Sequence, residues 1–147
     1  MISAYENCTN LTGSPVCGEK VTSMTWAYRN CYNLTGSPVC GNNVTSMYQA
    51  YENCYNLCGN MYMYPKNVNN ITKCFYGRNT SNRLNIYVIS GSNTMTKLLY
   101  NNTSSLIGAN ITWTDDTETN GYYYNTSSNI YIYPVTNVAA AREANGD

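Results

Sequence analysis

Residues 4–18 read Ala4-Tyr5-Glu6-Asn7-Cys8-Thr9-Asn10-Leu11-Thr12-Gly13-Ser14-Pro15-Val16-Cys17-Gly18, and the same phrase returns at residues 27–41 with two substitutions. It begins a third time at Ala50-Tyr51-Glu52-Asn53-Cys54, so the period is 23 residues. A fixed period in this range indicates a repeat architecture, in which each repeat buries its apolar face against its neighbours. Such proteins generally act through shape and surface, which makes binding a better first hypothesis than catalysis.

A pattern of alternating residues extends the repeat beyond the third copy. Its successive occurrences start at Ser14, Ser37, Asn60, Asn85, Asn110 and Asn129. Alternation with a period of two indicates β-strands. We therefore expect a β-rich (α/β) solenoid of about five to six coils, with a short parallel sheet and short helical turns. The solenoid should comprise residues 1–114, and residues 115–147 should form a C-terminal capping segment of the same domain.

The two faces of the expected strands differ in chemistry. The apolar parity, which we place inward, comprises Met61, Met63, Ile86, Val88, Ile111, Trp113, Ile130 and Ile132, with Pro15, Cys17, Pro38 and Cys40 in the first two strands. The outward parity forms a tyrosine-rich stripe of Tyr62, Tyr64, Tyr87, Tyr131 and Tyr133, with Thr112. Because tyrosine offers rigid contact area with a hydrogen-bonding tip, this stripe is the candidate binding site. Alternatively, these tyrosines pair across strands only to stabilise the sheet.

The remainder of each repeat predicts other local structure. Val21, Met24, Ala27 and Tyr28 have a spacing that suits a short helical turn packed against the sheet. Pro15 and Pro38 lack an N–H group, so the first two strands should be short or irregular. After a turn-rich loop at residues 115–121, residues 122–124 and 130–134 are expected to form closing strands. Residues 139–144 should form a short helix.

The phrase Ala-Tyr-x-Asn-Cys-x-Asn-Leu-Thr, followed by Val-Thr-Ser-Met, resembles the BspA-type leucine-rich repeat, which has Phe in place of Tyr. The resemblance covers residues 1–75 well and residues 76–115 weakly. The region from Asn60 onward is also similar to repeat proteins of tailed phages of gut bacteria. The resemblance implies a curved, leucine-rich-repeat-like solenoid of the kind found on bacterial adhesins and phage proteins. The chain departs from the family in carrying Ser-Pro-Val-Cys at the strand position.

The seven cysteines follow the repeat. Cys8, Cys31 and Cys54 form one column, Cys17 and Cys40 form another, and Arg78 falls where the first column would continue. We expect a ladder of buried free thiols, because cysteine packs as a small hydrophobe and the odd count is unusual for a disulfide framework. A disulfide between neighbouring coils, which lie about 5 Å apart, is the alternative. No metal site is expected, since the chain lacks histidine and any Cys-x-x-Cys pair.

Asparagines form columns too, at Asn7, Asn30, Asn53 and Asn102 and at Asn10, Asn33 and Asn56. We expect their side chains to cap turns and to hydrogen-bond the neighbouring repeat. A different pattern, Asp116-x-Glu118-x-Asn120-Gly121, copies the first half of a calcium loop, but Ser127 stands at the twelfth position. An acidic surface turn is therefore expected there, with a weak cation site as the alternative.

Composition narrows the range of partners. The net charge is zero and only 11% of residues are charged, so there is no basic surface to bind nucleic acid. No apolar run is long enough to span a membrane, and residues 1–6 do not resemble a secretory signal peptide. Met1 occupies the position of Met24 and Met47. The first repeat should therefore lack a polar cap, and we expect self-association or fusion to another virion or surface protein through this end. The alternatives are that the sequence is a fragment of a longer array or that the first half-coil frays.

Together these features predict a non-enzymatic repeat module of a virion fibre or other extracellular appendage. It would attach to a host-surface glycan or protein, or decorate the particle, and would be located on the virion or extracellular surface. The alternative is the ligand-binding repeat region of a bacterial cell-surface adhesin. An enzyme such as a depolymerase would need paired carboxylates facing a groove. The eight acidic residues lie mostly in expected turns, so we expect no catalytic residues and no cofactor.

Overall fold

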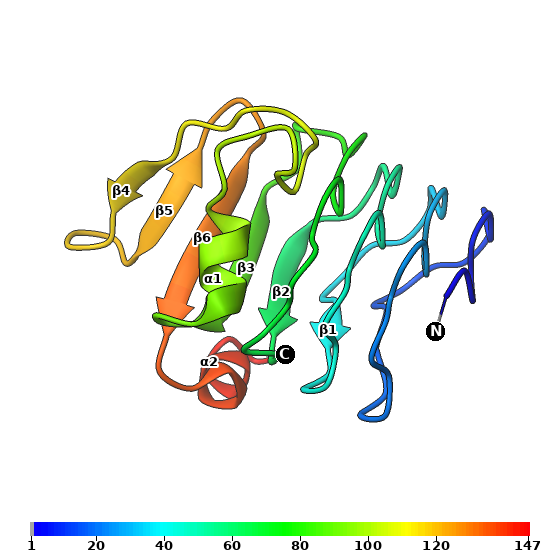
Figure 1. The fold of residues 1–147 in the computed structure, drawn as a ribbon, viewed down its shortest axis with the longest axis horizontal. Helices are drawn as coiled ribbons and strands as arrows, with labels where there is room; N and C mark the ends of the chain where they lie inside the picture. The colour runs from blue at the N-terminus through cyan, green and yellow to red at the C-terminus, as the bar shows by residue number, and fades with distance from the viewer. Residues whose placement is uncertain (1) are drawn as a thin grey trace.

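The computed structural model describes residues 2–147 and shows a six-stranded mixed sheet with two short helices (Figure 1). In chain order the elements are β1 (Val39–Cys40), β2 (Gly59–Met63), β3 (Leu84–Ile89), α1 (Asn93–Leu98), β4 (Thr114–Asp116), β5 (Tyr122–Asn125), β6 (Ile130–Val135) and α2 (Val138–Ala144). Their order across the sheet is β1-β2-β3-β6-β5-β4. The first four of these pair in parallel, and β5 and β4 complete the sheet in antiparallel fashion.

The predicted solenoid of five to six coils is therefore wrong. Only the alternating segments that start at Asn60, Asn85 and Asn129 coincide with β2, β3 and β6. The segment at Ser37 yields the two-residue β1, and the one at Ser14 yields a single bridge from Val16 to Val39. The short strands agree with the prediction made from Pro15 and Pro38, because proline has no backbone N–H group to donate to a neighbouring strand. Residues 110–113 form no strand at all.

The main departure from the repeat is the position of β6. It pairs in parallel with β3, where a continuing array would have placed residues 110–113. The alternation of β6 continues that of β3, because Ile132 lies beside Ile86 on one face and Tyr133 lies beside Tyr87 on the other. Short loops then permit only antiparallel pairing of β5 with its neighbours on both sides. A mixed sheet with a hairpin edge replaces the expected end of the array.

The expected helical turns are also wrong. Residues 24–31 and their counterparts form consecutive hydrogen-bonded turns, and the described part of the chain contains no helix before α1. Each of these turns contains two residues with positive φ that lie four positions apart. The pairs are Ser3 and Asn7, Trp26 and Asn30, Gln49 and Asn53, and Lys73 and Gly77. A left-handed residue interrupts the helical hydrogen-bond ladder, so the chain bends at each one. We call these turns the stacked turns; the first spans residues 2–11, the second 24–34 and the third 47–57.

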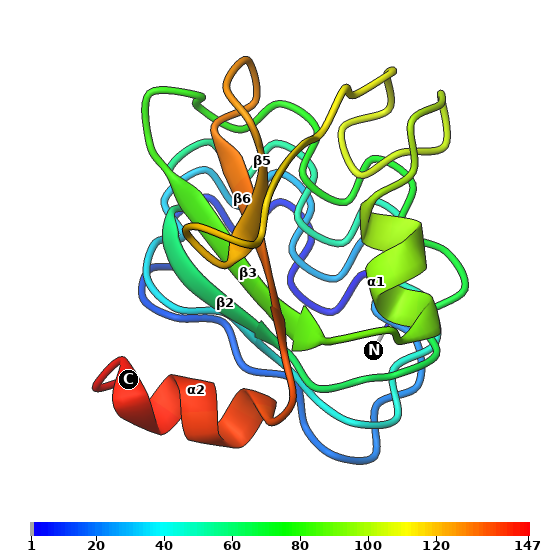
Figure 2. The same ribbon diagram turned by 90° about the vertical axis from the view of Figure 1, so that its left-hand side faces the viewer.

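The core lies between the sheet and the stacked turns. The inward parity is confirmed for β2, β3 and β6, because Met61, Met63, Ile86, Val88, Ile130 and Ile132 are all buried in one cluster. From the opposite side, the aromatic rings of Tyr28, Tyr51 and Phe75 stack on one another in this cluster, with centroids 5.4 and 5.8 Å apart. The two helices lie on opposite sides of the sheet (Figure 2). Leu98 of α1 enters the core, and Val138 of α2 packs on the outer face.

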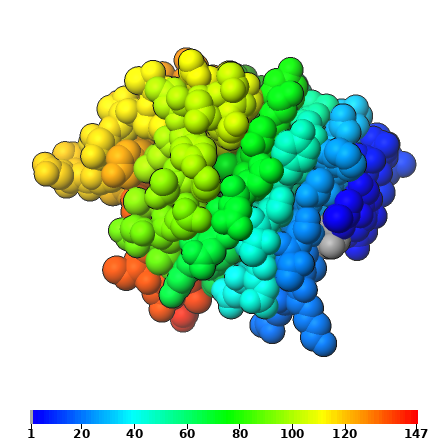
Figure 3. Space-filling view, viewed as in Figure 1, coloured from blue at the N-terminus to red at the C-terminus, as the bar shows by residue number. Residues whose placement is uncertain are grey.

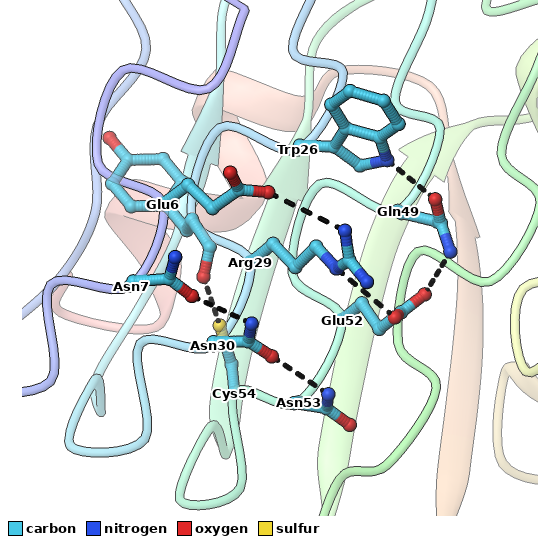
Figure 4. A network of polar contacts seen from close by, with 10 residues as sticks. Glu6, Asn7, Trp26, Arg29, Asn30, Gln49, Glu52, Asn53 and Cys54 are labelled. Atoms are coloured by element: carbon cyan, nitrogen blue, oxygen red, sulfur yellow. Dashed lines mark hydrogen bonds and ion pairs between the residues drawn. The ribbon is translucent and has the colours of Figure 1, made fainter.

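Side-chain ladders join the stacked turns, as the columns predicted (Figure 4). The Asn30 amide donates to Asn7 Oδ1, and the Asn53 amide donates to Asn30 Oδ1, at 2.7 and 2.8 Å. Asn33 and Asn56 donate to backbone carbonyls of the preceding turn. Asn102 does not join the first column; it accepts a bond from Ser104 in its own loop, and Gly77 occupies the position next to Asn53. The asparagines thus stabilise the stack as well as its bends.

The cysteines form the buried thiol ladder that we expected, with Cys8 as an exception. All seven are free, and Cys17, Cys31, Cys40, Cys54 and Cys74 are buried. Cys31 donates its thiol to the Tyr5 carbonyl, and Cys54 donates to the Tyr28 carbonyl, at 2.8 and 3.0 Å. Burial raises the pKa of both thiols, so they remain protonated donors at neutral pH. Cys8 is exposed, and Cys58 is partly buried.

Gly77 ends the asparagine ladder, and its replacement by alanine should destabilise the fold. A Cβ atom there would lie 2.2 Å from Asn53 Oδ1, and the φ of Gly77 is +78°. We expect the free energy of unfolding of the Gly77→Ala variant to fall by about 2 to 4 kcal/mol. The loss comes from backbone strain and from displacement of the Asn53 side-chain amide. Gly121→Ala is the matched control, because φ is +79° and no atom lies within 4 Å of the added Cβ. Urea titration should give a clearly lower free energy of unfolding for Gly77→Ala than for Gly121→Ala. Equal free energies for the two variants would contradict the clash with Asn53.

Candidate functional site

The outer face of the sheet gathers most of the tyrosines that the alternation placed outward. Across the strands, Tyr62, Tyr87 and Tyr133 are in register, and Asn60, Asn85, Tyr131 and Tyr124 form a second row. Tyr122 of β5 lies 5.3 Å from Tyr133, centroid to centroid. We define the aromatic face as Arg83, Tyr87, Tyr122, Tyr124, Tyr131 and Tyr133. It combines three neighbouring strands, β3, β6 and β5.

Most ring faces in this surface contact other rings. Tyr62 stacks on Tyr87 at 5.3 Å, and Tyr87 stacks on Tyr133 at 4.6 Å with nearly parallel planes. Tyr124 stacks on Tyr131 in the second row at 5.6 Å. The cross-strand stacking that we considered as the alternative role therefore exists. Tyr122 differs from these stacked rings, because its ring stands at 90° to that of Tyr131.

Tyr62 and Tyr64 do not belong to the open surface. Tyr62 is fully buried, since Val138 of α2 and Val39 pack against it, and Tyr64 is partly buried beside the same cluster. The Tyr62 hydroxyl donates to the Asp147 carboxylate and accepts a bond from the Asn145 amide. Helix α2 therefore covers the β2 end of the predicted stripe. Tyr87, Tyr131 and Tyr133 remain half-buried, with their neighbours on β5.

Arg83, which the sequence pattern did not single out, lies at the centre of the aromatic face. Its guanidinium carbon is 3.6 Å from the centroid of the Tyr131 ring, and 5.5 Å from that of Tyr122. It donates from Nε to Asn85 Oδ1 and from Nη2 to the Tyr133 hydroxyl, both at 2.7 Å. No carboxylate within residues 2–147 forms an ion pair with it. An exposed cation is thus held in one orientation by uncharged groups.

Tyr122 and Tyr124 were also missed as site residues, although we expected residues 122–124 to form a strand. The signal that could have found them is the run Tyr122-Tyr123-Tyr124 itself, where alternation puts the first and third rings on one face. Arg83 carried no comparable signal. It precedes β3 by one residue, and it reaches Tyr133 only because β6 pairs with β3.

On this face, the hydroxyls of Tyr122 and Tyr133 remain neutral in the physiological range. Burial raises the pKa of Tyr133 and of Tyr122 above the usual value for a phenol. Burial and the neighbouring Asp147 carboxylate raise the pKa of Tyr62 to about 12. The hydroxyls can therefore both donate and accept hydrogen bonds. The face is suited to a polar, uncharged or anionic ligand and carries no strong base.

The predicted calcium-like segment forms the turn between β4 and β5. The Asn120 amide donates to the Asp116 carboxylate at 2.7 Å, so this carboxylate is already engaged. Among residues 2–147 no three His, Cys, Asp or Glu side chains are grouped so that they could hold a metal ion. Within the same range no helix has the length and apolarity needed to cross a membrane.

Comparison with protein-family models, with curated proteins and with solved structures found no match to this chain. The resemblance to BspA-type repeats therefore stays a prediction. The chemistry of the aromatic face is therefore the basis on which a function can be inferred.

Proposed function

We propose that the protein is a non-enzymatic recognition module of a virion fibre or similar extracellular appendage, and that it binds a host-surface glycan through the aromatic face. The observation that carries the proposal is the arrangement of Arg83. It is an exposed cation that pairs with no acidic side chain among residues 2–147, and it is fixed by Tyr131, Tyr133 and Asn85. Because the guanidinium is already oriented, a ligand does not have to immobilise it, and less free energy is lost on binding.

The surrounding groups support a carbohydrate ligand. Sugars present many hydroxyl groups, and the tyrosine hydroxyls of the aromatic face can act as donors and acceptors toward them. The ring of Tyr122, turned perpendicular to its neighbours, adds an aromatic surface of different orientation. The Arg83 guanidinium favours a glycan that carries a carboxylate or sulfate group, since charge-assisted hydrogen bonds to guanidinium are strong and directional.

The test is binding of the labelled protein to an array of neutral and acidic glycans, followed by titration of the best ligand. Arg83→Gln should weaken binding at least tenfold, which corresponds to about 1.4 kcal/mol. The double change Tyr122→Ser and Tyr124→Ser should do the same. Far-ultraviolet circular dichroism should confirm that both variants remain folded.

Tyr32→Ser combined with Tyr55→Ser is the matched control. Both rings are about half exposed, and neither belongs to the aromatic face. This control should keep wild-type affinity. If it loses as much affinity as Arg83→Gln, or if the wild-type protein binds no glycan but captures a host-surface protein, the glycan proposal is wrong.

A further inference from the structure

The repeat brings four sulfur-containing side chains together in the core. Cys17 and Cys40 form one column and Met24 and Met47 form another, and the two members of each column are 23 positions apart. Figure 3 shows successive repeats as adjacent bands, so equivalent residues of neighbouring repeats lie side by side. Cys40 belongs to β1, and Met24 and Met47 begin the second and third stacked turns. All four side chains belong to the main core cluster.

Cys40 lies at the centre of this group, which we call the sulfur cluster. Its Sγ atom is 3.8 Å from Met24 Sδ and 3.7 Å from Met47 Sδ. The Cys17 and Cys40 thiols are hydrogen-bonded to each other, because the bridge formed by Val16 places the two cysteines on neighbouring segments. Cys40, Met24 and Met47 are fully buried, and Cys17 is 5% exposed.

The spacing of these sulfur atoms suits a shared metal ion. Metal–sulfur bonds are about 2.3 Å long, so two sulfur atoms bound to one ion at a tetrahedral or trigonal angle lie about 3.8 to 4.0 Å apart. The two distances from Cys40 are already close to this value. An ion bonded to Cys40 can therefore reach either methionine with little displacement of the side chains. Packing alone gives similar contacts between sulfur atoms, so the test below detects the ion itself.

The donor types favour a soft, monovalent ion. Thiolate and thioether sulfur are the ligands that suit Cu(I) in proteins. Zn²⁺ is bound by cysteine, histidine and carboxylate groups, and methionine is not among its usual ligands. One Cys40 thiolate and one Cu(I) ion also sum to zero charge. A divalent ion on the same thiolate would leave a net charge in the core, where an uncompensated charge is costly.

We propose that the sulfur cluster binds one Cu(I) ion, with Cys40, Met24 and Met47 as ligands and Cys17 beside them. As the copper–sulfur bond forms, the ion replaces the thiol proton of Cys40, which leaves to solvent, and no electron is transferred. The bound ion links β1 to the second and third stacked turns. The sequence gave no signal for this site, because its ligands come from two columns that only the fold brings together. The cluster lies on the opposite side of the sheet from the aromatic face, so it is independent of glycan binding.

Anaerobic titration with the Cu(I)–bicinchoninate complex tests the site. The reduced protein carries Cys8→Ser and Cys58→Ser, so that its more accessible thiols do not compete for copper. It is titrated both as purified and after refolding with the complex present, because refolding removes any limit on entry of the ion into the core. We expect one Cu(I) per chain, a shell of sulfur atoms only in X-ray absorption, and a higher melting temperature. Binding of Zn²⁺ in preference to Cu(I) would overturn the choice of ion.

Two variants remove the ligands in the same background. The double change Met24→Leu and Met47→Leu conserves volume, so it should keep the fold while it weakens Cu(I) binding at least tenfold. Cys40→Ala should abolish binding. Met61→Leu and Cys54→Ala are the matched controls, because both side chains are fully buried and lie outside the sulfur cluster, and both should bind Cu(I) with unchanged affinity. If the refolded protein binds no Cu(I), or if the double variant binds it as tightly as Met61→Leu, the proposal is wrong.

Discussion

Changing Leu34 to Asp should leave the protein unfolded at 25 °C. The Leu34 side chain is 1% exposed and belongs to the main core cluster, together with Cys31 and Leu57 of the stacked turns. Loss of the buried leucine costs about 2 to 5 kcal/mol, and an unpaired carboxylate in its place adds several more. The sum matches or exceeds the total stability of a typical domain, about 5 to 15 kcal/mol.

Thr35→Asp provides the comparison for this variant. Thr35 is the next residue and is exposed, so the same charge enters at nearly the same place without entering the core. We expect the free energy of unfolding of Thr35→Asp to lie within about 0.5 kcal/mol of that of the original protein, as is usual for surface substitutions. Circular dichroism and urea titration measure both variants. A cooperative transition of wild-type stability for Leu34→Asp would contradict the arrangement of the core.

Changing Arg78 to Ala should produce the other large loss. Arg78 occupies the next position of the Cys31 and Cys54 column, is 7% exposed, and has no carboxylate partner among the described residues. Its guanidinium donates to backbone carbonyls of five residues: Leu57, Asn79, Asn82, Ser128 and Asn129. The side chain thereby ties the end of the stacked turns to the loop that leads into β6. Burial without a counter-ion lowers its pKa to about 10.

Without this guanidinium, buried carbonyls would lose their donors, and each such group costs about 1 to 3 kcal/mol. We therefore expect Arg78→Ala to lose at least about 3 kcal/mol, which corresponds to a fall of roughly 10 °C in melting temperature. Arg78→Lys should recover only part of the loss, because an ammonium group has three donors and cannot match the planar fork.

Arg142→Ala in α2 is the control for removing an arginine from a less buried position, and we expect it to be nearly neutral. Differential scanning calorimetry gives the melting temperatures of the three variants. If Arg78→Ala and Arg142→Ala had the same melting temperature, the five carbonyls would have found water or other donors, and Arg78 would have no structural role.

The repeat alone predicted much of the local structure. A period of 23 residues places Tyr5, Tyr28 and Tyr51 in one column, and the structure shows these rings stacked. The period likewise aligned the asparagines and cysteines whose side chains now bond from turn to turn. These features follow from sequence because adjacent repeats meet at a constant offset. Alternation similarly identified the buried side chains of β2, β3 and β6, since successive strand residues point to opposite faces.

The helix at residues 138–144 was also within reach of sequence, given its alanines and the Asn137 side chain that caps it. By contrast, the sequence predicted the wrong local structure between residues 21 and 75, where we expected helical turns. Apolar spacing there fits a helix, whereas the left-handed residues of the structure, Asn30 and Asn53 among them, show that the chain bends instead. Asparagine tolerates this conformation but does not require it, so composition could not distinguish the two.

The sequence by itself determined the columns, the inner and outer faces of three strands, and the helix that ends the chain. The tertiary structure alone decided that β6 lies beside β3, that α2 covers Tyr62, and that Arg83 meets Tyr133. Arg83 and Tyr133 are 50 positions apart and belong to no common repeat. Several segments share the same alternation, so their order in the sheet depends on which pairing leaves the lowest free energy for the whole domain. That comparison involves contacts between distant residues, which a local pattern does not encode.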